Sequence, residues 1–101
     1  MKILVIKSSS MGDIIHALPV ARDIRKALPD ARIDWVAEES FRDIPRLAPD
    51  VDKIYCTAFR RWRKALFSSQ TRAEIASLRR ALREERYDAV LDIQGLIRSA
   101  V

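Results

Sequence analysis

Short apolar runs alternate along this chain with longer segments whose apolar residues recur every three or four positions. Residues 2–6 form a β-branched apolar run between polar neighbours, which predicts a fully buried strand. After the polar loop 7–13, apolar residues at helical spacing predict a first helix. Pro19 lies inside this helix, where it should break the hydrogen bonds of one turn or kink the helix. The apolar stripe of this first helix consists of Ile14, Leu18, Ala21, Ile24 and Leu28.

The middle of the chain continues the alternation. Residues 32–37 and 53–57 read as the second and third strands, and the pattern of Trp35 within 32–37 is typical of a core position. Between them, residues 39–47 predict a short helix that is broken near Pro45.

The last third of the chain predicts one more helix and one more strand. Thr71 and Glu74 have the spacing of a capping box, and the apolar periodicity then continues to about Arg86. Residues 89–93 predict the fourth strand, and Gly95 opens a further element. The charged residues of this helix are expected to form a solvated face.

Strands that alternate with helices predict an α/β fold with a parallel sheet. Right-handed crossovers favour the half-Rossmann strand order 3-2-1-4 with flanking helices. Ligands of such sheets bind at the carboxyl ends of the strands where the order reverses, here between the first and fourth strands. The loops 7–13 and 94–99 should therefore converge on one crevice. Because 95–101 reads as the start of a helix, we expect residues 1–101 to be a truncated domain.

The two converging loops contain the candidate site residues. Asp13 stands at a helix N-terminus, where it either complements the helix dipole or serves as a general base. The loop lacks the glycines of a dinucleotide fingerprint or a P-loop, and Gly12 and Gly95 are expected to relieve tight backbone geometry. Loop position predicts that the following residues line the crevice: Lys7, Ser9, Ser10, Gly12, Gln94, Gly95 and Arg98.

A basic run follows the third strand at the same edge. Arg60, Arg61, Arg63 and Lys64 surround Trp62, with Phe67 close behind. Such a run is either a solvated surface or a site for phosphates, which arginine binds in a bidentate manner. Tryptophan and cations on one turn also suit an anionic bilayer surface. We expect residues 60–67 to be mobile or irregular without a ligand, because adjacent cations repel one another.

Composition narrows the class of protein. The 101 residues are about one domain's worth, and 19 basic against 14 acidic residues give a net charge of +5, which favours anionic partners. Cys56 is the only cysteine and His16 the only histidine, so neither an intrachain disulfide nor a metal site is expected. The sequence has neither a signal-peptide pattern nor an apolar run of membrane-spanning length, which predicts a soluble cytoplasmic protein able to touch a membrane.

Three stretches together resemble one family. Residues 3–19, with Ser-Met-Gly-Asp at 10–13, the basic run 60–64, and residues 87–100 are similar to the ADP-heptose lipopolysaccharide heptosyltransferases of glycosyltransferase family 9. The basic run resembles the type I branch in particular. Residues 34–39 add a weaker match, and Arg98 stands where the family pattern has lysine.

The resemblance implies the N-terminal part of a glycosyltransferase-B fold, which receives the lipid A–Kdo acceptor. ADP-heptose would bind a C-terminal domain that this chain lacks, so the chain alone should be inactive. Asp13 would act as the general base of an inverting, metal-independent transfer without a cofactor. The phosphates or carboxylates of the acceptor would be held by Arg60, Arg61, Arg63 and Lys64. The enzyme would be a cytoplasmic monomer, peripheral to the anionic inner face of the cytoplasmic membrane.

Two other functions remain open at this point. A basic anion-binding or nucleic-acid-binding module would explain the charge, but the sequence has no aromatic pair of the RNA-recognition type, no helix-turn-helix spacing and no zinc ligands. No nucleic-acid partner is therefore expected. Another glycosyltransferase-B enzyme would share the fold, and the fold alone does not decide between them.

Overall fold

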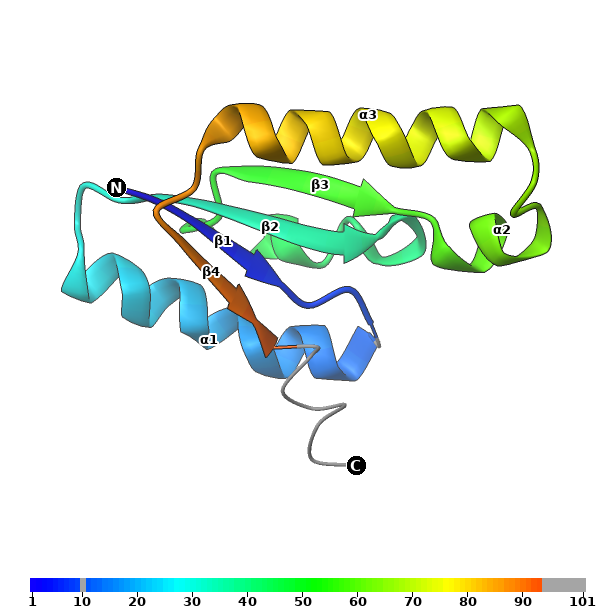
Figure 1. Cartoon of the computed structure of the whole chain (residues 1–101). Coiled ribbons are helices and arrows are strands. Elements are labelled where there is room, and N and C mark those ends of the chain that lie inside the picture. The colour runs from blue at the N-terminus through cyan, green and yellow to red at the C-terminus, as the bar shows by residue number, and fades with distance from the viewer. Residues whose placement is uncertain (10, 94–101) are drawn as a thin grey trace.

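The computed structural model describes residues 1–9 and 11–93. Its centre is a parallel four-stranded sheet in the order β3-β2-β1-β4 (Figure 1). The strands are β1 (Lys2–Ile6), β2 (Arg32–Glu38), β3 (Lys53–Thr57) and β4 (Ala89–Asp92). The predicted order and the adjacency of the first and fourth strands are confirmed.

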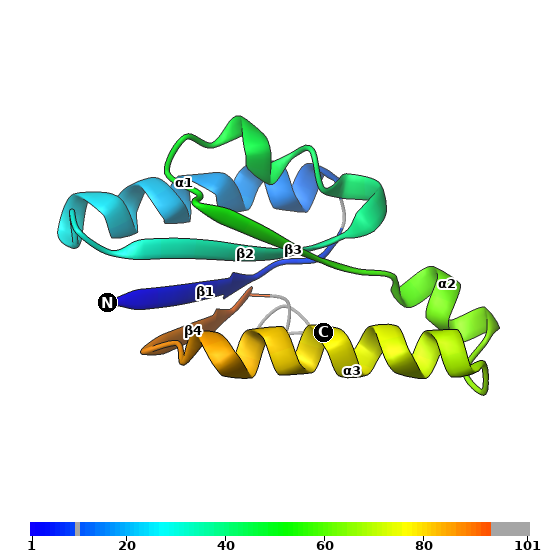
Figure 2. The same ribbon diagram turned by 90° about the horizontal axis from the view of Figure 1, so that it is seen from above.

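Two long helices cover opposite faces of this sheet. Helix α1 (Met11–Ala27) lies on one face and α3 (Ser69–Glu85) on the other, as Figure 2 shows. The predicted helix over 39–47 is wrong, because the segment forms two 3-10 turns, η1 (Glu39–Phe41) and η2 (Pro45–Leu47). Pro45 has no backbone N–H to donate to the preceding turn, which disfavours a helix interior, and it stands instead as the first residue of η2.

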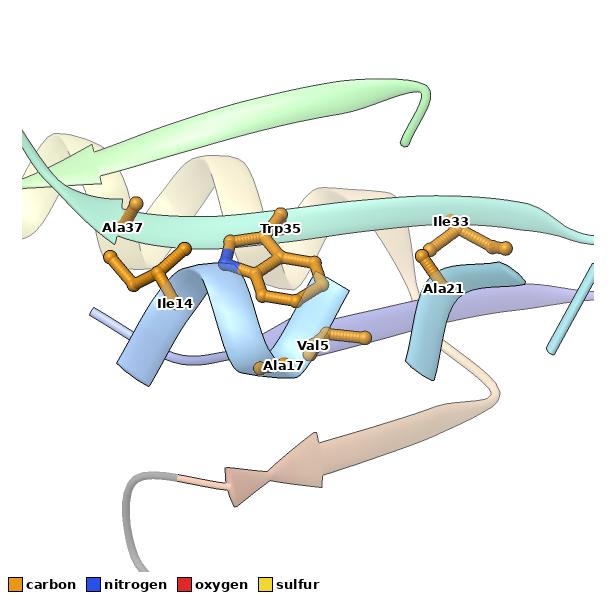
Figure 3. Close-up of a cluster of buried hydrophobic side chains, with 7 residues drawn as sticks. All are labelled: Val5, Ile14, Ala17, Ala21, Ile33, Trp35 and Ala37. Carbon is orange, nitrogen blue, oxygen red and sulfur yellow. The ribbon is translucent and has the colours of Figure 1, made fainter. Parts of the chain in front are cut away.

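The hydrophobic core lies between α1 and the sheet. Trp35 is fully buried at its centre, and its indole Nε1 donates a hydrogen bond to the carbonyl oxygen of Lys7 over 3.2 Å. Small residues on α1 let the helix approach this ring closely (Figure 3). The buried cluster comprises Val5, Ile14, Ala17, Ala21, Ile33, Trp35 and Ala37. The prediction of Trp35 as a core residue is confirmed.

Helix α1 begins earlier than its apolar stripe indicates and passes through Pro19, which is exposed. Gly12 lies in the first turn of α1 without a positive φ, and a Cβ at this position would meet open space. The prediction that Gly12 relieves tight backbone geometry is therefore wrong. Gly95 lies outside the described residues.

The ends of α3 also differ from the prediction. The helix begins at Ser69, so Thr71 is a buried residue of its first turns rather than a cap, and Glu74 contacts Arg61. The capping box is therefore wrong. The helix ends with Arg86 in the left-handed conformation, at a φ of 52°, with its N–H donating to the carbonyl of Arg83. A glycine is the usual residue there, so no sequence signal marked this cap.

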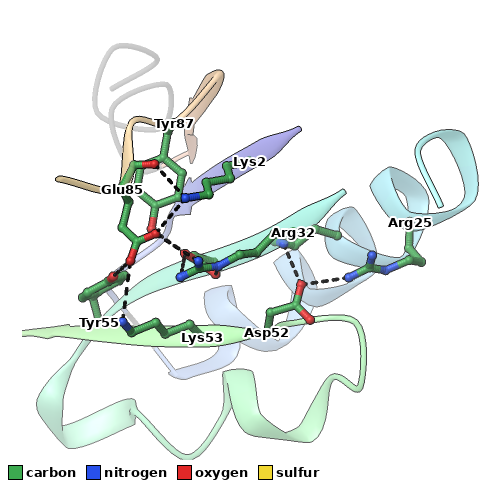
Figure 4. Close-up of polar contacts among 10 residues, drawn as sticks. Lys2, Arg25, Arg32, Asp52, Lys53, Tyr55, Glu85 and Tyr87 are labelled. Carbon is green, nitrogen blue, oxygen red and sulfur yellow. Dashed lines mark hydrogen bonds and ion pairs between the residues drawn. The ribbon is translucent and has the colours of Figure 1, made fainter. Parts of the chain in front are cut away.

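A polar cluster ties the end of α3 to the amino ends of the strands (Figure 4). The carboxylate of Glu85 lies 3.3 Å from Lys2 and 3.0 Å from Arg32. Desolvation opposes its ionisation, but hydrogen bonds from Lys2 and Arg32 hold the pKa of Glu85 below its ordinary value. Beside it, the fully buried Asp34 pairs with Arg32 and accepts a hydrogen bond from the Tyr87 hydroxyl. The prediction of a purely solvated face is therefore wrong at Glu85.

Candidate functional site

A cleft of about 460 Å³ opens at the carboxyl ends of β1, β2 and β3. Three segments far apart in the sequence meet there: the loop after β1, the turn after β2, and the short helix α2 (Phe59–Lys64) after β3. Its lining residues are Ser8, Ser9, Glu38, Ser40, Phe41, Phe59, Arg60, Arg63 and Lys64. The predicted meeting of the first loop with the basic run at one sheet edge is thereby confirmed.

Glu38 joins the three segments. Its backbone N–H donates to the carbonyl of Ser8 over 2.9 Å. Its carboxylate oxygen Oε2 accepts hydrogen bonds of 3.0 Å from the hydroxyl of Thr57 and from the backbone N–H of Phe59, the first residue of α2. The side chain is buried, with 8% of the residue exposed. Sequence reasoning missed Glu38, and its one signal was a carboxylate ending a strand of otherwise mostly apolar character.

Helix α2 presents three cations to the cleft. Arg60, Arg63 and Lys64 have i, i+3 and i+4 spacing, which places them on one face of the helix. All three are exposed, and within the described part of the chain none of them forms an ion pair. They line the cleft together with Ser8 and Ser9 and bring three positive charges to it.

Arg61 is directed elsewhere. Its guanidinium binds the carboxylate of Glu39 in η1 over 3.2 Å and that of Glu74 in α3 over 2.8 Å. Hydrogen bonds from Arg61 hold the pKa of Glu74 below its ordinary value. The pKa of Arg61 is raised by Glu74 and then by Glu39. Arg61 therefore ties α2 to its two neighbours and is not among the residues that line the cleft.

The remainder of the basic run also departs from expectation. Residues 59–64 form a helix rather than an irregular segment. Trp62 is buried, with its ring edge-on to Phe59 at a centroid distance of 5.7 Å, so its predicted interfacial position is wrong. The exposed apolar side chains lie just beyond, at Leu66 and Phe67.

The first loop places its candidate residues differently. Ser9 lines the cleft, whereas Lys7 is buried and is not among the lining side chains. Asp13 is exposed in the first turn of α1, a position compatible with either predicted role. The predicted contributions of the third serine of the first loop and of the other converging loop lie outside the described residues. This concerns Ser10, Gln94, Gly95 and Arg98.

Residues 1–9 and 11–93 contain neither a metal-binding cluster nor a membrane-spanning helix. In that range, no three His, Cys, Asp or Glu side chains gather closely enough to hold a metal ion. None of the helices described there has both the length and the apolar character needed to cross a membrane. The polar side chains that line the cleft are those of three cations, three serines and Glu38.

The chain is similar in sequence to several known proteins. No family model matches the chain. Lipopolysaccharide heptosyltransferase 1 of Escherichia coli K12 is 48% identical over 100 residues, which cover 99% of this chain and 31% of that protein. The predicted resemblance is confirmed. The chain thus spans about a third of the length of the curated relatives it matches.

Solved structures give the same result. The E. coli heptosyltransferase WaaC with ADP superposes with a TM-score of 0.88 at 47% identity, over 99% of this chain and 31% of that one. WaaC with ADP-2-deoxy-2-fluoro heptose has the same TM-score, with 99% and 32% of the two chains covered. The glycosyl transferase family 9 protein of Veillonella parvula, at 20% identity and a TM-score of 0.73 over 90% of this chain and 25% of that one, supports the fold alone. The fold is that of the N-terminal part of family 9 structures, as predicted.

Proposed function

We propose that this chain supplies the acceptor-binding domain of an enzyme that moves heptose from ADP-heptose to the Kdo of lipid A–Kdo in synthesis of the lipopolysaccharide inner core. The similarity to lipopolysaccharide heptosyltransferase 1 over nearly the whole chain is the observation that supports this proposal. The complete enzyme would have the glycosyltransferase-B architecture. The donor would be a nucleotide-linked heptose, a proposal supported by the structures of WaaC with ADP and with ADP-2-deoxy-2-fluoro heptose, and it would bind mainly outside this chain.

The acceptor would bind in the cleft. Arg60, Arg63 and Lys64 supply positive charge for the phosphates of lipid A or the carboxylate of Kdo. The hydroxyl of Ser9, which also lines the cleft, suits a hydrogen bond to a sugar hydroxyl. Arg61 would support this site by holding α2 in place, because its guanidinium would have to leave Glu39 and Glu74 to reach an acceptor.

Asp13 would act as the general base. In this reaction its carboxylate removes the proton of a Kdo hydroxyl, and the resulting oxygen forms a bond to the anomeric carbon of heptose. The bond from that carbon to the ADP oxygen breaks, ADP leaves with the bonding electrons, and the configuration inverts. No metal and no cofactor enter this scheme. The enzyme would work in the cytoplasm at the inner face of the cytoplasmic membrane, which holds the lipid-linked acceptor.

Binding of the acceptor by the chain itself tests the first part of the proposal. Lipid A–Kdo in detergent micelles is the probe, and the triple variant Arg60→Ala, Arg63→Ala, Lys64→Ala should bind it at least about tenfold more weakly. The matched control is the triple alanine variant of three exposed arginines of α3, which loses the same three positive charges: Arg79, Arg80 and Arg83. Equal losses in the two triple variants would reduce the effect to net charge and contradict a specific acceptor site.

Transfer is tested in a chimera, in which this sequence replaces the matching 100 residues of the E. coli heptosyltransferase 1. The chimera should transfer heptose, and Asp13→Asn should lower kcat by about 10²-fold or more while leaving acceptor affinity unchanged. A variant with nearly unchanged kcat would leave Asp13 as a residue that only stabilises the helix N-terminus.

A further inference from the structure

The turn between α2 and α3 exposes two large apolar side chains. Phe67 is 88% exposed and Leu66 is 58% exposed. The backbone of this turn is held, since the N–H of Ala65 donates to Trp62 over 3.2 Å and that of Ser68 donates to Ala65 over 3.0 Å. The exposure of Phe67 therefore belongs to a defined turn rather than to a loose chain.

The position of the turn sets it apart from other exposed apolar residues. In both views, α2 and the turn that follows it form one end of the molecule, beyond the carboxyl end of the sheet (Figures 1 and 2). Leu47, by contrast, is 73% exposed but belongs to η2, which packs against α1. The two exposed apolar side chains therefore belong to a turn at one end of the molecule.

Cations accompany this apolar tip. Arg63 and Lys64 stand three and two residues before Leu66, and both are exposed and form no ion pair within the described residues. Exposed apolar side chains beside cations are the composition of segments that lie in the boundary between lipid headgroups and acyl chains. Anionic headgroups attract the cations, while the aromatic ring enters the apolar layer.

We propose that the Leu66–Phe67 turn inserts into an anionic lipid bilayer, with Arg63 and Lys64 at the level of the headgroups. The inference rests on the proposed function, in which the acceptor is anchored in a membrane and the cleft must face that surface. Arg63 and Lys64 line the cleft and also lie beside the turn, so insertion would place the mouth of the cleft at the headgroup layer.

The test is sedimentation of the full 101-residue chain with lipid vesicles that contain no acceptor. Vesicles of phosphatidylcholine with about one third phosphatidylglycerol should bind the chain, and vesicles of phosphatidylcholine alone should bind it weakly. Phe67→Ser should lower the partition coefficient at least about fivefold, and Leu66→Ser should lower it less. Leu47→Ser, the control of comparable exposure, should stay within about twofold of the original chain. Circular dichroism of each variant verifies that the fold is unchanged.

Depth is measured independently with Phe67→Trp. Lipids brominated on the acyl chains should quench the added indole, beyond any quenching of the original chain. Equal partitioning of Phe67→Ser and the original chain, or an added indole that is not quenched, would overturn the proposal. Concentration-dependent dimerisation in sedimentation velocity that Phe67→Ser abolishes would also overturn it, since the turn would then contact a second copy.

A separate binding experiment distinguishes insertion of the turn from acceptor binding in the cleft. A phosphorylated Kdo-containing headgroup without acyl chains should bind Phe67→Ser and the original chain equally. Arg60→Ala, which removes a cation of the cleft that is farther along α2 from the turn, should weaken that headgroup binding. Loss of vesicle binding with intact headgroup binding supports the insertion of the turn. Loss of headgroup binding in Phe67→Ser would instead show that Phe67 acts in the cleft, and it would overturn the proposal that the turn is a separate membrane-binding surface.

Discussion

Replacing Glu38 should release α2 from the sheet. In Glu38→Ala, the buried Thr57 hydroxyl and the Phe59 N–H lose the carboxylate oxygen that both now contact at 3.0 Å. A hydrogen bond to a charged group contributes roughly 1.5–3 kcal/mol to stability, and two such bonds share one acceptor here. Removing a buried carboxylate also removes its desolvation cost. We therefore expect the free energy of unfolding to fall by about 2–4 kcal/mol, less than two full bonds.

Urea denaturation followed by circular dichroism measures this loss. With a slope of about 1–3 kcal/mol/M, the midpoint should move down by roughly 0.7–4 M. Glu38→Gln keeps an amide oxygen that can accept both bonds and should lose only about 1 kcal/mol. Glu84→Ala is the control, because Glu84 is an exposed carboxylate of α3 that contacts neither donor of this pair.

Binding of lipid A–Kdo separates a positioning role from an electrostatic one. If Glu38 positions α2, Glu38→Ala should weaken binding and Glu38→Gln should largely preserve it. If Glu38 instead acts mainly by lowering the positive electrostatic potential of the cleft, both neutral variants should bind the anionic acceptor more tightly. A Glu38→Ala chain within about 0.5 kcal/mol of the original stability, with unchanged acceptor binding, would refute the reasoning.

Two other substitutions examine the ion pairs around α3. Glu85 has a folded pKa below its ordinary value of 4.5, so its carboxylate stabilises the fold above that pH and the stabilisation is lost as the pH falls through the folded pKa. Glu85→Gln should therefore lower stability at neutral pH and flatten its acid dependence in urea titrations; an unchanged acid dependence would show that the cluster is dispensable. Arg61→Ala should shift the indole N–H resonance of Trp62 in ¹⁵N NMR spectra and leave that of Trp35 in place, whereas two unmoved resonances would mean that Arg61 does not hold α2.

The strands and their order followed from local patterns. Residues 2–6 and 32–37 are apolar enough to be recognised as buried strands, and βαβ handedness leaves few orders for four parallel strands. The meeting of Ser9 with Arg60 and Lys64 followed from the same rule, since all three come just after strand ends and were expected at one edge. The cleft lies at the ends of β1, β2 and β3, whereas the predicted crevice between the first and fourth strands depends on residues 94–99, which lie outside the described residues.

The parts that sequence reasoning missed depend on partners far away in the chain. Glu74 has capping-box spacing from Thr71, yet its carboxylate binds Arg61, and Glu85 binds Lys2 at the other end of the sequence. Local spacing contains no information about such pairs. Glu38 was missed for the same reason, because its donors lie 19 and 21 residues further on.

The short helix α2 combines these local and distant effects. Six residues are too few to form a stable helix alone, so the position of α2 must come from tertiary contacts. Glu38 fixes its first residue, Trp62 is buried beneath it, and Arg61 ties its outer side to Glu39 and Glu74. The cleft cations take no part in these contacts among the described residues. Substituting Arg60, Arg63 or Lys64 should therefore change anion binding at little cost in stability, whereas substituting the anchoring residues should lower stability and displace the cations together.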